Sequence, residues 1–221
     1  MKDYTIFDIV GPNMIGPSSS HTAGACRLGN IAYKIAEKSI KEVTFLLHGS
    51  FANTYRGHGT DKALVGGILG FDTDDERIKD SFQIAKAKGI NFKFLAEYLG
   101  DVHSNTVKII ITKEDNTTVE ILGSSIGGGN IVVTEINGLK LEFTGEYTTL
   151  IISHIDKPGM VSKVTAVLSE YQINIAFMRV YRHEKGQNAF MIIETDDEIN
   201  NNLVIKIKDI EYVKKAYLIN I

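Results

Sequence analysis

The feature that most limits the fold of this chain is the order of strand and helix patterns from residue 147 to residue 221. An apolar strand pattern comes first, and a helix pattern with Pro158 at its first position follows it. Two strand patterns, a weaker helix pattern and a last strand pattern complete the order. The segments are 147–155, 158–171, 173–182, 188–196, 199–210 and 211–219. This βαββαβ order predicts a ferredoxin-like unit.

Residues 1–145 show a different order of patterns, in which most helix patterns come first and most strand patterns follow them. Apolar or small residues spaced at i, i+4, i+7 and i+11 from Gly24 predict a helix over 20–38. The run 42–50 predicts a buried strand that enters a loop. Further helices are expected at 60–70 and 76–89, and strands at 91–99, 105–112, 117–125, 130–136 and 139–143. We therefore expect an α+β domain with a mostly antiparallel sheet over 1–145, followed by a second domain over 147–221.

The composition argues against several classes of function. The net charge is −3 and no basic block occurs, so no nucleic-acid partner is expected. No apolar run approaches the ~20 residues that span a bilayer, and the first residues lack the apolar core of a signal peptide. The single cysteine, Cys26, is expected to be a small buried hydrophobe, because one thiolate makes neither a disulfide nor a cluster. We expect a cytoplasmic protein without a membrane partner.

The string GPSSSHT, residues 16–22, places many hydroxyls in front of a helix. One serine is enough for a cap, and with Ser18 as the cap the third helical position is His21, so no capping box forms. A helix N-terminus offers free N–H groups and a partial positive charge, which suit a carboxylate or a phosphate. We expect a pocket for a small anion with the His21 imidazole at its rim. Its hydroxyls come from Ser18, Ser19, Ser20 and Thr22.

Three other loops carry polar or glycine-rich sequences. In GSFANTYRGHGTDKA, residues 49–63, two glycines flank His58, which exposes the imidazole, and Asp61 is a candidate to orient it. Alone, a loop histidine is often only solvated. Thr60 starts the next helix, Asn105 precedes a strand in DVHSNTVKI, and GSSIGGGNI is expected to pack closely against another group through Gly127, Gly128 and Gly129. Four such loops, with no compact triad and no P-loop lysine motif, suggest half of a site.

The string HIDKPGMVSKVTAVLSEYQINIAFMRV resembles an ACT domain, particularly the serine-binding kind at the end of phosphoglycerate dehydrogenases. The resemblance implies that two copies pair into a continuous sheet and bind small amino acids at the seam. The implied residues are His154, Asp156, Gly159 and Asn174, with Asn174 opening the next strand near the same end of the unit. Alternatively, Pro158 and Gly159 only shape a turn, and His154 is an exposed loop residue.

GPSSSHT, GHGTD, HSNT and SIGGGNI, in this order over residues 1–145, resemble the beta subunit of bacterial iron–sulfur-dependent L-serine dehydratases. The resemblance implies a [4Fe–4S] cluster held by a separate alpha subunit, and the conversion of L-serine to pyruvate and ammonia without pyridoxal phosphate. An iron without a cysteine ligand would bind the substrate hydroxyl, and a neutral histidine would take the α-proton. The serines would then hold the substrate carboxylate.

On this basis we expect His58 to be the general base, oriented by Asp61, and His21 to play a neutral role next to the substrate or the cluster. Substrate contacts are expected from Ser18, Ser19, Ser20, Thr22, Thr60 and Asn105. The alternative is a non-catalytic regulatory subunit, because the first domain also resembles the allosteric substrate-binding domain of long phosphoglycerate dehydrogenases. The two imidazoles favour the enzyme, since an anion sensor would more naturally use arginine or lysine.

Overall fold

The computed structural model describes residues 13–37, 39–182 and 184–220. The interpretation of the N-terminus and the end of the helix predicted for 20–38 fall outside these residues. The chain separates into two compact units, residues 1–138 (unit 1) and 139–221 (unit 2), and the domain boundary expected at 145–147 stays a prediction. Among the described residues, no helix has both the length and the apolar character needed to cross a bilayer.

The sheet that begins in unit 1 has the strand order β2-β1-β3-β4-β5, and β6 follows as the sixth strand after a tight turn. β1 pairs in parallel with β2, whereas the β1–β3, β3–β4 and β4–β5 pairs are antiparallel. The prediction of a mostly antiparallel sheet is therefore confirmed. The strands are β1 (Glu42–Leu47), β2 (Asn91–Ala96), β3 (Thr106–Thr112), β4 (Thr118–Gly127), β5 (Asn130–Ile136) and β6 (Leu139–Phe143).

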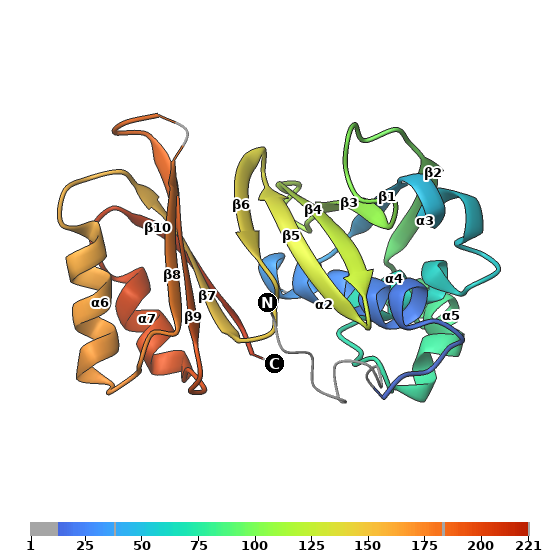
Figure 1. Cartoon of the computed structure of the whole chain (residues 1–221), viewed down its shortest axis with the longest axis horizontal. Coiled ribbons are helices and arrows are strands. Elements are labelled where there is room, and N and C mark those ends of the chain that lie inside the picture. Colours follow the sequence, from blue (N-terminus) through green and yellow to red (C-terminus); the bar gives the residue numbers. More distant parts are fainter. Residues whose placement is uncertain (1–12, 38, 183, 221) are drawn as a thin grey trace, which may run out of the picture. The chain divides into compact units, whose positions relative to one another are not determined.

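Two helices of unit 1, α2 and α4, pack against each other beside the sheet (Figure 1). The contact is close: a Cβ atom on Gly67 of α4 would overlap the backbone oxygen of Cys26 in α2. The apolar face expected for the first helix is buried as predicted. The helices are η1 (Ser19–Gly24), α2 (Ala25–Ile35), α3 (Gly49–Thr54), α4 (Thr60–Ile68), η2 (Glu76–Asp80) and α5 (Ser81–Ala87).

The structure differs from the prediction at two places in unit 1. A short helix, α3, begins at Gly49 where a loop was expected after β1. Gly49 has a φ of 55°, and the Ser104 backbone oxygen accepts the N–H groups of Ser50 and Phe51, so the chain curls directly into a helix. The helix predicted over 76–89 is divided into the 3₁₀ helix η2 and α5.

Unit 2 contains a four-stranded antiparallel sheet in the order β10-β7-β9-β8, with α6 and α7 on one face (Figure 1). The ferredoxin-like order predicted from the sequence is confirmed. Its core lies between this face and the two helices, and includes the fully buried Leu150, Val164 and Leu203. The elements are β7 (Thr148–Ile155), α6 (Met160–Glu170), β8 (Phe177–Arg182), β9 (Asn188–Thr195), α7 (Asn201–Lys208) and β10 (Val213–Ile219).

The start of α6 corrects one detail of the prediction. Pro158 is not the first residue of the helix, because Pro158 and Gly159 form a turn and α6 begins at Met160. Gly159 has a φ of 85° and occupies the N-cap position. A left-handed residue here ends the extended chain after β7 and delays the first helical turn.

Candidate functional site

The serine run caps a wide helical turn at the start of α2. Ser18 has an extended backbone, and its Oγ accepts the backbone N–H of His21 at 3.1 Å, so the predicted cap is confirmed. The next six residues form a π-helical turn, η1, a feature often found at functional sites. Ser19 and Ser20 are half-buried, and their hydroxyls make no hydrogen bond to another described residue. They therefore remain available to a ligand.

His21 and His58 meet edge to face, with ring centroids 4.8 Å apart and an interplanar angle of 72°. The Thr22 hydroxyl donates to the backbone oxygen of His58 at 3.2 Å, which holds the two segments together. Burial, and then the charge that His58 can carry, lower the pKa of His21. His58 is exposed, whereas His21 is half-buried. The pair therefore combines a neutral inner imidazole with an outer one that solvent and substrate can reach.

Ser50 is a member of this cluster to which the sequence assigned no role. Its Oγ lies 3.0 Å from His21 Nε2, and the other ring nitrogen, Nδ1, lies 3.5 Å from Ser18 Oγ. The Phe51 ring packs against the His21 ring at 5.4 Å between centroids. The only signal in the sequence is the Gly49–Ser50 pair directly after a buried strand.

The third and fourth predicted loops also converge here. The Ser104 backbone oxygen accepts the N–H of Ser50 at 2.8 Å, and the Asn105 backbone oxygen accepts the N–H of Ser125 at 3.0 Å. A Cβ atom on Gly24, the last residue of η1, would overlap the Ser125 hydroxyl. The structure therefore brings the SSSHT, GHGTD, HSNT and GSS segments together around one helical turn.

Three buried polar atoms in these segments have no hydrogen-bond partner among the described residues: Thr60 Oγ1, Asn105 Oδ1 and Ser125 Oγ. Buried polar groups in native proteins nearly always have a hydrogen-bond partner. Thr60 and Asn105 were expected from the sequence, and Ser125 was not. Their unsatisfied bonding capacity supports a site that is completed by something outside the described chain.

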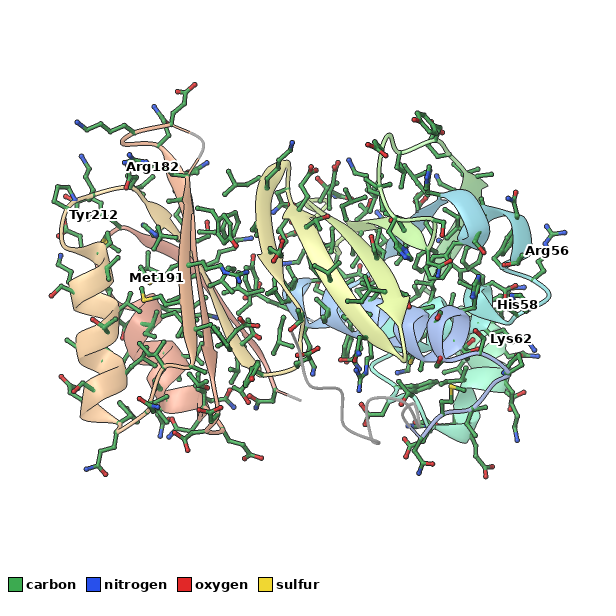
Figure 2. All side chains as sticks on the ribbon, viewed as in Figure 1. Arg56, His58, Lys62, Arg182, Met191 and Tyr212 are labelled. Carbon is green, nitrogen blue, oxygen red and sulfur yellow. The ribbon has the colours of Figure 1, made fainter. Side chains whose placement is uncertain are left out.

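The contacts of Asp61 in the structure do not include the hydrogen bond to His58 that the sequence suggested. Its Oδ1 accepts the backbone N–H of Lys62 at 2.8 Å, and no hydrogen bond joins Asp61 to His58 among the described residues. Burial raises the pKa of Asp61, against smaller opposing effects of Lys62 and Arg56. Arg56, His58 and Lys62 gather just before and within the first turn of α4 (Figure 2). Arg56 and Lys62 are exposed cations to which no role was expected from the sequence.

Three glycines form the tip of the β4–β5 hairpin: Gly127 ends β4, and Gly128 and Gly129 connect it to β5. Gly127, Gly128 and Gly129 have φ values of 105°, 62° and 82°, which other residues rarely adopt. The Gly129 backbone oxygen accepts a hydrogen bond from Arg27 Nη1 at 3.2 Å. A Cβ atom on Gly127 would meet no described atom within 4 Å. At this glycine the requirement comes from the turn, not from the close packing that we expected.

Cys26 is not suited to bind a metal cluster. Its thiol is buried, donates to the Phe71 backbone oxygen at 3.4 Å, and has a pKa raised to about 12, first by burial. The prediction of a small buried hydrophobe is confirmed. Within the described ranges, no group of three or more His, Cys, Asp or Glu side chains is arranged to hold a metal ion. The donor set of this part of the chain therefore does not fit an iron–sulfur cluster.

In unit 2 the four residues expected at an effector site do not share one location. His154 is 2% exposed at the end of β7, so the alternative of an exposed loop residue is wrong. Its Nδ1 lies 2.8 Å from the Ile155 backbone oxygen, and its buried Nε2 has no partner among the described residues. Asp156 lies beside it and is bound to the β8–β9 hairpin through Arg182 Nη1 at 2.9 Å and Gly186 N at 3.1 Å.

Asn174 lies at the opposite end of this sheet, which corrects the position expected for it. It precedes β8, whose first residue, Phe177, is opposite Glu194, and Glu194 is opposite Thr149 near the start of β7. His154, by contrast, pairs with Ala189 at the far end of β9. The expected position is wrong because α6 runs antiparallel to β7, so that β8 begins at the end of the sheet where β7 also begins.

A family model described as "Serine dehydratase beta chain" matches residues 5–136, which is more than half of the chain. The chain belongs to the serine dehydratase beta chain family. A second model, for the ACT domain, matches residues 148–211. These matches confirm the family and the fold class expected from the sequence.

Full-length relatives agree with this placement. The chain is 41% identical over 222 residues to the L-serine dehydratase beta chain of Peptoniphilus asaccharolyticus, covering 100% of both chains. It is 47% identical over 204 residues to the probable L-serine dehydratase beta chain of Bacillus subtilis (strain 168), covering 92% of each. It is also 29% identical over 203 residues to D-3-phosphoglycerate dehydrogenase of Methanocaldococcus jannaschii, covering 88% of this chain and 36% of that enzyme.

Proposed function

We propose that this chain is the beta subunit of an L-serine dehydratase and supplies substrate-binding and acid–base groups to an active site shared with an alpha subunit. The reaction is the elimination of water from L-serine, followed by release of pyruvate and ammonia. The observation that carries the proposal is the His21–His58 pair, with ring centroids 4.8 Å apart and the Ser18, Thr22 and Ser50 hydroxyls in contact with it. The beta-chain relatives support the assignment.

The chemistry needs a base for a weakly acidic α-proton and a group that activates the hydroxide for departure. His58 is exposed and lies beside the neutral imidazole of His21, so we assign it the role of the base that removes the α-proton. Ser18 caps η1 and the Thr22 hydroxyl donates to the His58 backbone oxygen, so the Ser19 and Ser20 hydroxyls in the first turn of η1 are the ones offered to the substrate carboxylate, which would meet partial positive charge there. Loss of water leaves aminoacrylate, which tautomerises and hydrolyses to pyruvate and ammonia.

The described residues of this chain form no cluster that could hold a metal ion to activate the leaving hydroxide. We infer that the activating group belongs to the alpha subunit and is the [4Fe–4S] cluster implied by the resemblance. The buried Cys26 thiol and the missing cluster of metal-binding side chains in the described ranges support this division. Thr60 Oγ1, Asn105 Oδ1 and Ser125 Oγ, which have no hydrogen-bond partner in the described part of the chain, fit a half-site that a second subunit completes.

The test is reconstitution of this chain with its alpha subunit under anaerobic conditions, followed by pyruvate and ammonia assays. We expect His58→Ala to lower kcat by ~10²-fold or more with little change in KM. It should also abolish exchange of the serine α-proton with solvent. Ser20→Ala should mainly raise KM. Near-full turnover by His58→Ala, together with an inactive His21→Ala, would exchange the two histidine roles.

A regulatory subunit that binds an anion is the second candidate. Two observations favour it: the relation to D-3-phosphoglycerate dehydrogenase over 88% of the chain, and the exposed Arg56 and Lys62 beside His58. The histidine variants separate the two functions. In a regulatory subunit, His58→Ala would change the response to an effector but would leave maximal turnover of the complex unchanged.

A further inference from the structure

We propose that Ser50 is a positioning residue that holds the His21 imidazole in the tautomer protonated at Nε2. This inference deepens the proposed function and rests on it for its catalytic consequence. It explains why the two adjacent histidines would have different roles, with His21 fixed as a neutral donor and His58 left as the base.

The position of Ser50 is strongly constrained by its backbone. Its N–H donates to the Ser104 backbone oxygen at 2.8 Å, and the Thr54 hydroxyl donates to its backbone oxygen at 2.8 Å. At Gly49, a Cβ atom would lie 2.6 Å from the same Ser104 oxygen, so a larger residue would push α3 away from this contact. The hydroxyl of Ser50 is therefore held in place by the chain on both sides of it.

The proposed tautomer gives each hydrogen-bond contact of the His21 ring one donor and one acceptor. Ser18 Oγ accepts the His21 backbone N–H at 3.1 Å, and in this arrangement its single proton is directed at Nδ1, which lies 3.5 Å away. With Nδ1 as the acceptor, the ring proton of the neutral imidazole is on Nε2, where it donates to Ser50 Oγ at 3.0 Å. Both nitrogens of His21 are then occupied, and neither is free to accept a substrate proton.

The neutral form of His21 also favours the role of His58 as the base. The groups packed around His21 are the Phe51 ring, the Ser18 and Ser50 hydroxyls and the His58 ring. The Phe51, Ser18 and Ser50 side chains carry no charge, so a neutral His21 adds no positive charge against the His58 ring beyond that of the exposed Arg56 and Lys62 nearby. The Ser50 hydroxyl thus positions the neutral His21 ring. Hydrogen-bond partners fix the tautomer of metal-binding histidines in the same way.

The first test uses the full chain alone, labelled with ¹⁵N-histidine, and reads the tautomer of His21 from its two ring-nitrogen chemical shifts. The His21 signals are assigned with a His21→Gln variant. We expect the wild-type ring to be protonated at Nε2 at neutral pH. Ser50→Ala should convert it to a mixture of tautomers, Ser50→Thr should retain the wild-type pattern, and Ser162→Ala, at an exposed position of α6, should change nothing.

A wild-type ring protonated at Nδ1, or an unchanged tautomer in Ser50→Ala, would overturn the proposal. A change in Ser50→Thr as large as that in Ser50→Ala would overturn it as well, because the hydroxyl would then not be the cause. These readouts require no activity. If the reconstituted complex fails to deaminate serine, the proposed function fails while the spectra still decide the role of Ser50.

The second test uses the reconstituted complex. Losing one hydrogen bond to a reacting cluster should lower kcat about tenfold and leave KM nearly unchanged, and Ser50→Thr should recover most of the loss. A KM effect in Ser50→Ala with unchanged kcat would contradict the positioning role and assign Ser50 to substrate binding.

Discussion

At the scale of single residues, burial shifts the pKa values of a histidine and a glutamate in opposite directions, because it disfavours the charged form of each. Burial lowers the pKa of His21 and raises the pKa of Glu194, so each group is driven towards its neutral form. Glu194 lies in β9, is 7% exposed, and has an Oε1 atom without a partner among the described residues. Its ionised form is therefore costly, even though Arg179 partly offsets the effect.

We predict that Glu194→Gln stabilises the chain at neutral pH, by on the order of 1 kcal/mol. The pKa of Glu194 is higher in the folded chain than in the unfolded chain, so its ionised form costs stability above the folded pKa. As the pH falls through that value the cost disappears. Urea unfolding between neutral and acidic pH should show a gap between variant and wild type that closes at low pH.

The control is Glu198→Gln, which alters an exposed carboxylate close by in the sequence. It should shift the unfolding midpoint very little at any pH. Loss of stability in Glu194→Gln at neutral pH would show that the charge of Glu194 is well compensated in the folded chain.

His21 has the reverse linkage. Its pKa is lower in the folded chain than in the unfolded chain, so its contribution to stability is complete above the unfolded value of about 6.5. It declines as the pH falls below that value, because the unfolded chain binds the proton more readily. His21→Gln should reduce the acid sensitivity of unit 1, measured as the pH dependence of the unfolding midpoint.

At the scale of elements, the close contact between α2 and α4 sets the position of η1. Gly67 of α4 touches the α2 backbone at Cys26 and Asn30, and Gly29 of α2 touches Leu64 in return. The glycines allow the two helices to approach at backbone distance, and η1 continues directly into α2. The site therefore depends on a helix contact in which its own residues take no part.

We predict that Gly67→Ala lowers stability by ~1–3 kcal/mol, because the new methyl group would overlap backbone atoms that cannot rotate away. Gly66→Ala, the neighbouring glycine of the same helix, is the matched control. Its methyl group would meet the Ile78 side chain at 3.1 Å, which can adjust. Thermal unfolding of both variants should therefore show a large loss for Gly67→Ala and a small change for Gly66→Ala. Equal losses would refute the backbone contact as the cause.

At the scale of the whole molecule, the chain combines the histidine and hydroxyl cluster of unit 1 with an ACT unit whose outer strands are β10 and β8. Phe177 and Val180 on β8 are 48% and 45% exposed. An edge strand with exposed apolar side chains is suited to pairing with another strand. We propose that two copies of the chain associate through this unit, as the ACT resemblance implies.

We predict that the full chain sediments as a dimer at tens of micromolar, roughly the range in which an interface of standard size holds. Val180→Lys places a charge on the edge strand and should shift the chain towards monomer. Lys206→Ala, on α7 away from this edge, is the control. A strictly monomeric wild-type chain at these concentrations would rule out association through β8.

We also predict that the purified chain alone is colourless and does not deaminate L-serine. Its one thiol is buried and strongly protonated, so it has no ligand set for a cluster. Absorption spectra and a pyruvate assay, before and after addition of the alpha subunit, test this. Serine deamination by the chain alone, after metal has been stripped, would contradict the division of the site between two subunits.

The sequence by itself determined the two units, the strand and helix types and the cap at Ser18. These depend on local periodicity and on residues close in the chain, which a single sequence displays directly. It also indicated His21, His58, Thr60 and Asn105, because their loops carry unusual polar strings. Those four do lie around one helical turn, although their roles in catalysis stay proposals.

Only the tertiary structure decided which of these side chains meet. Ser50 joined the site because Ser104, 54 positions along the chain, accepts its backbone N–H, and Ser125 joined it because Gly24 leaves room for its hydroxyl. Asn174 lies at the other end of the sheet from the position expected for it, because the direction of α6 decides where β8 begins. Such contacts join segments that are distant in sequence, and local patterns carry no information about the distance between them.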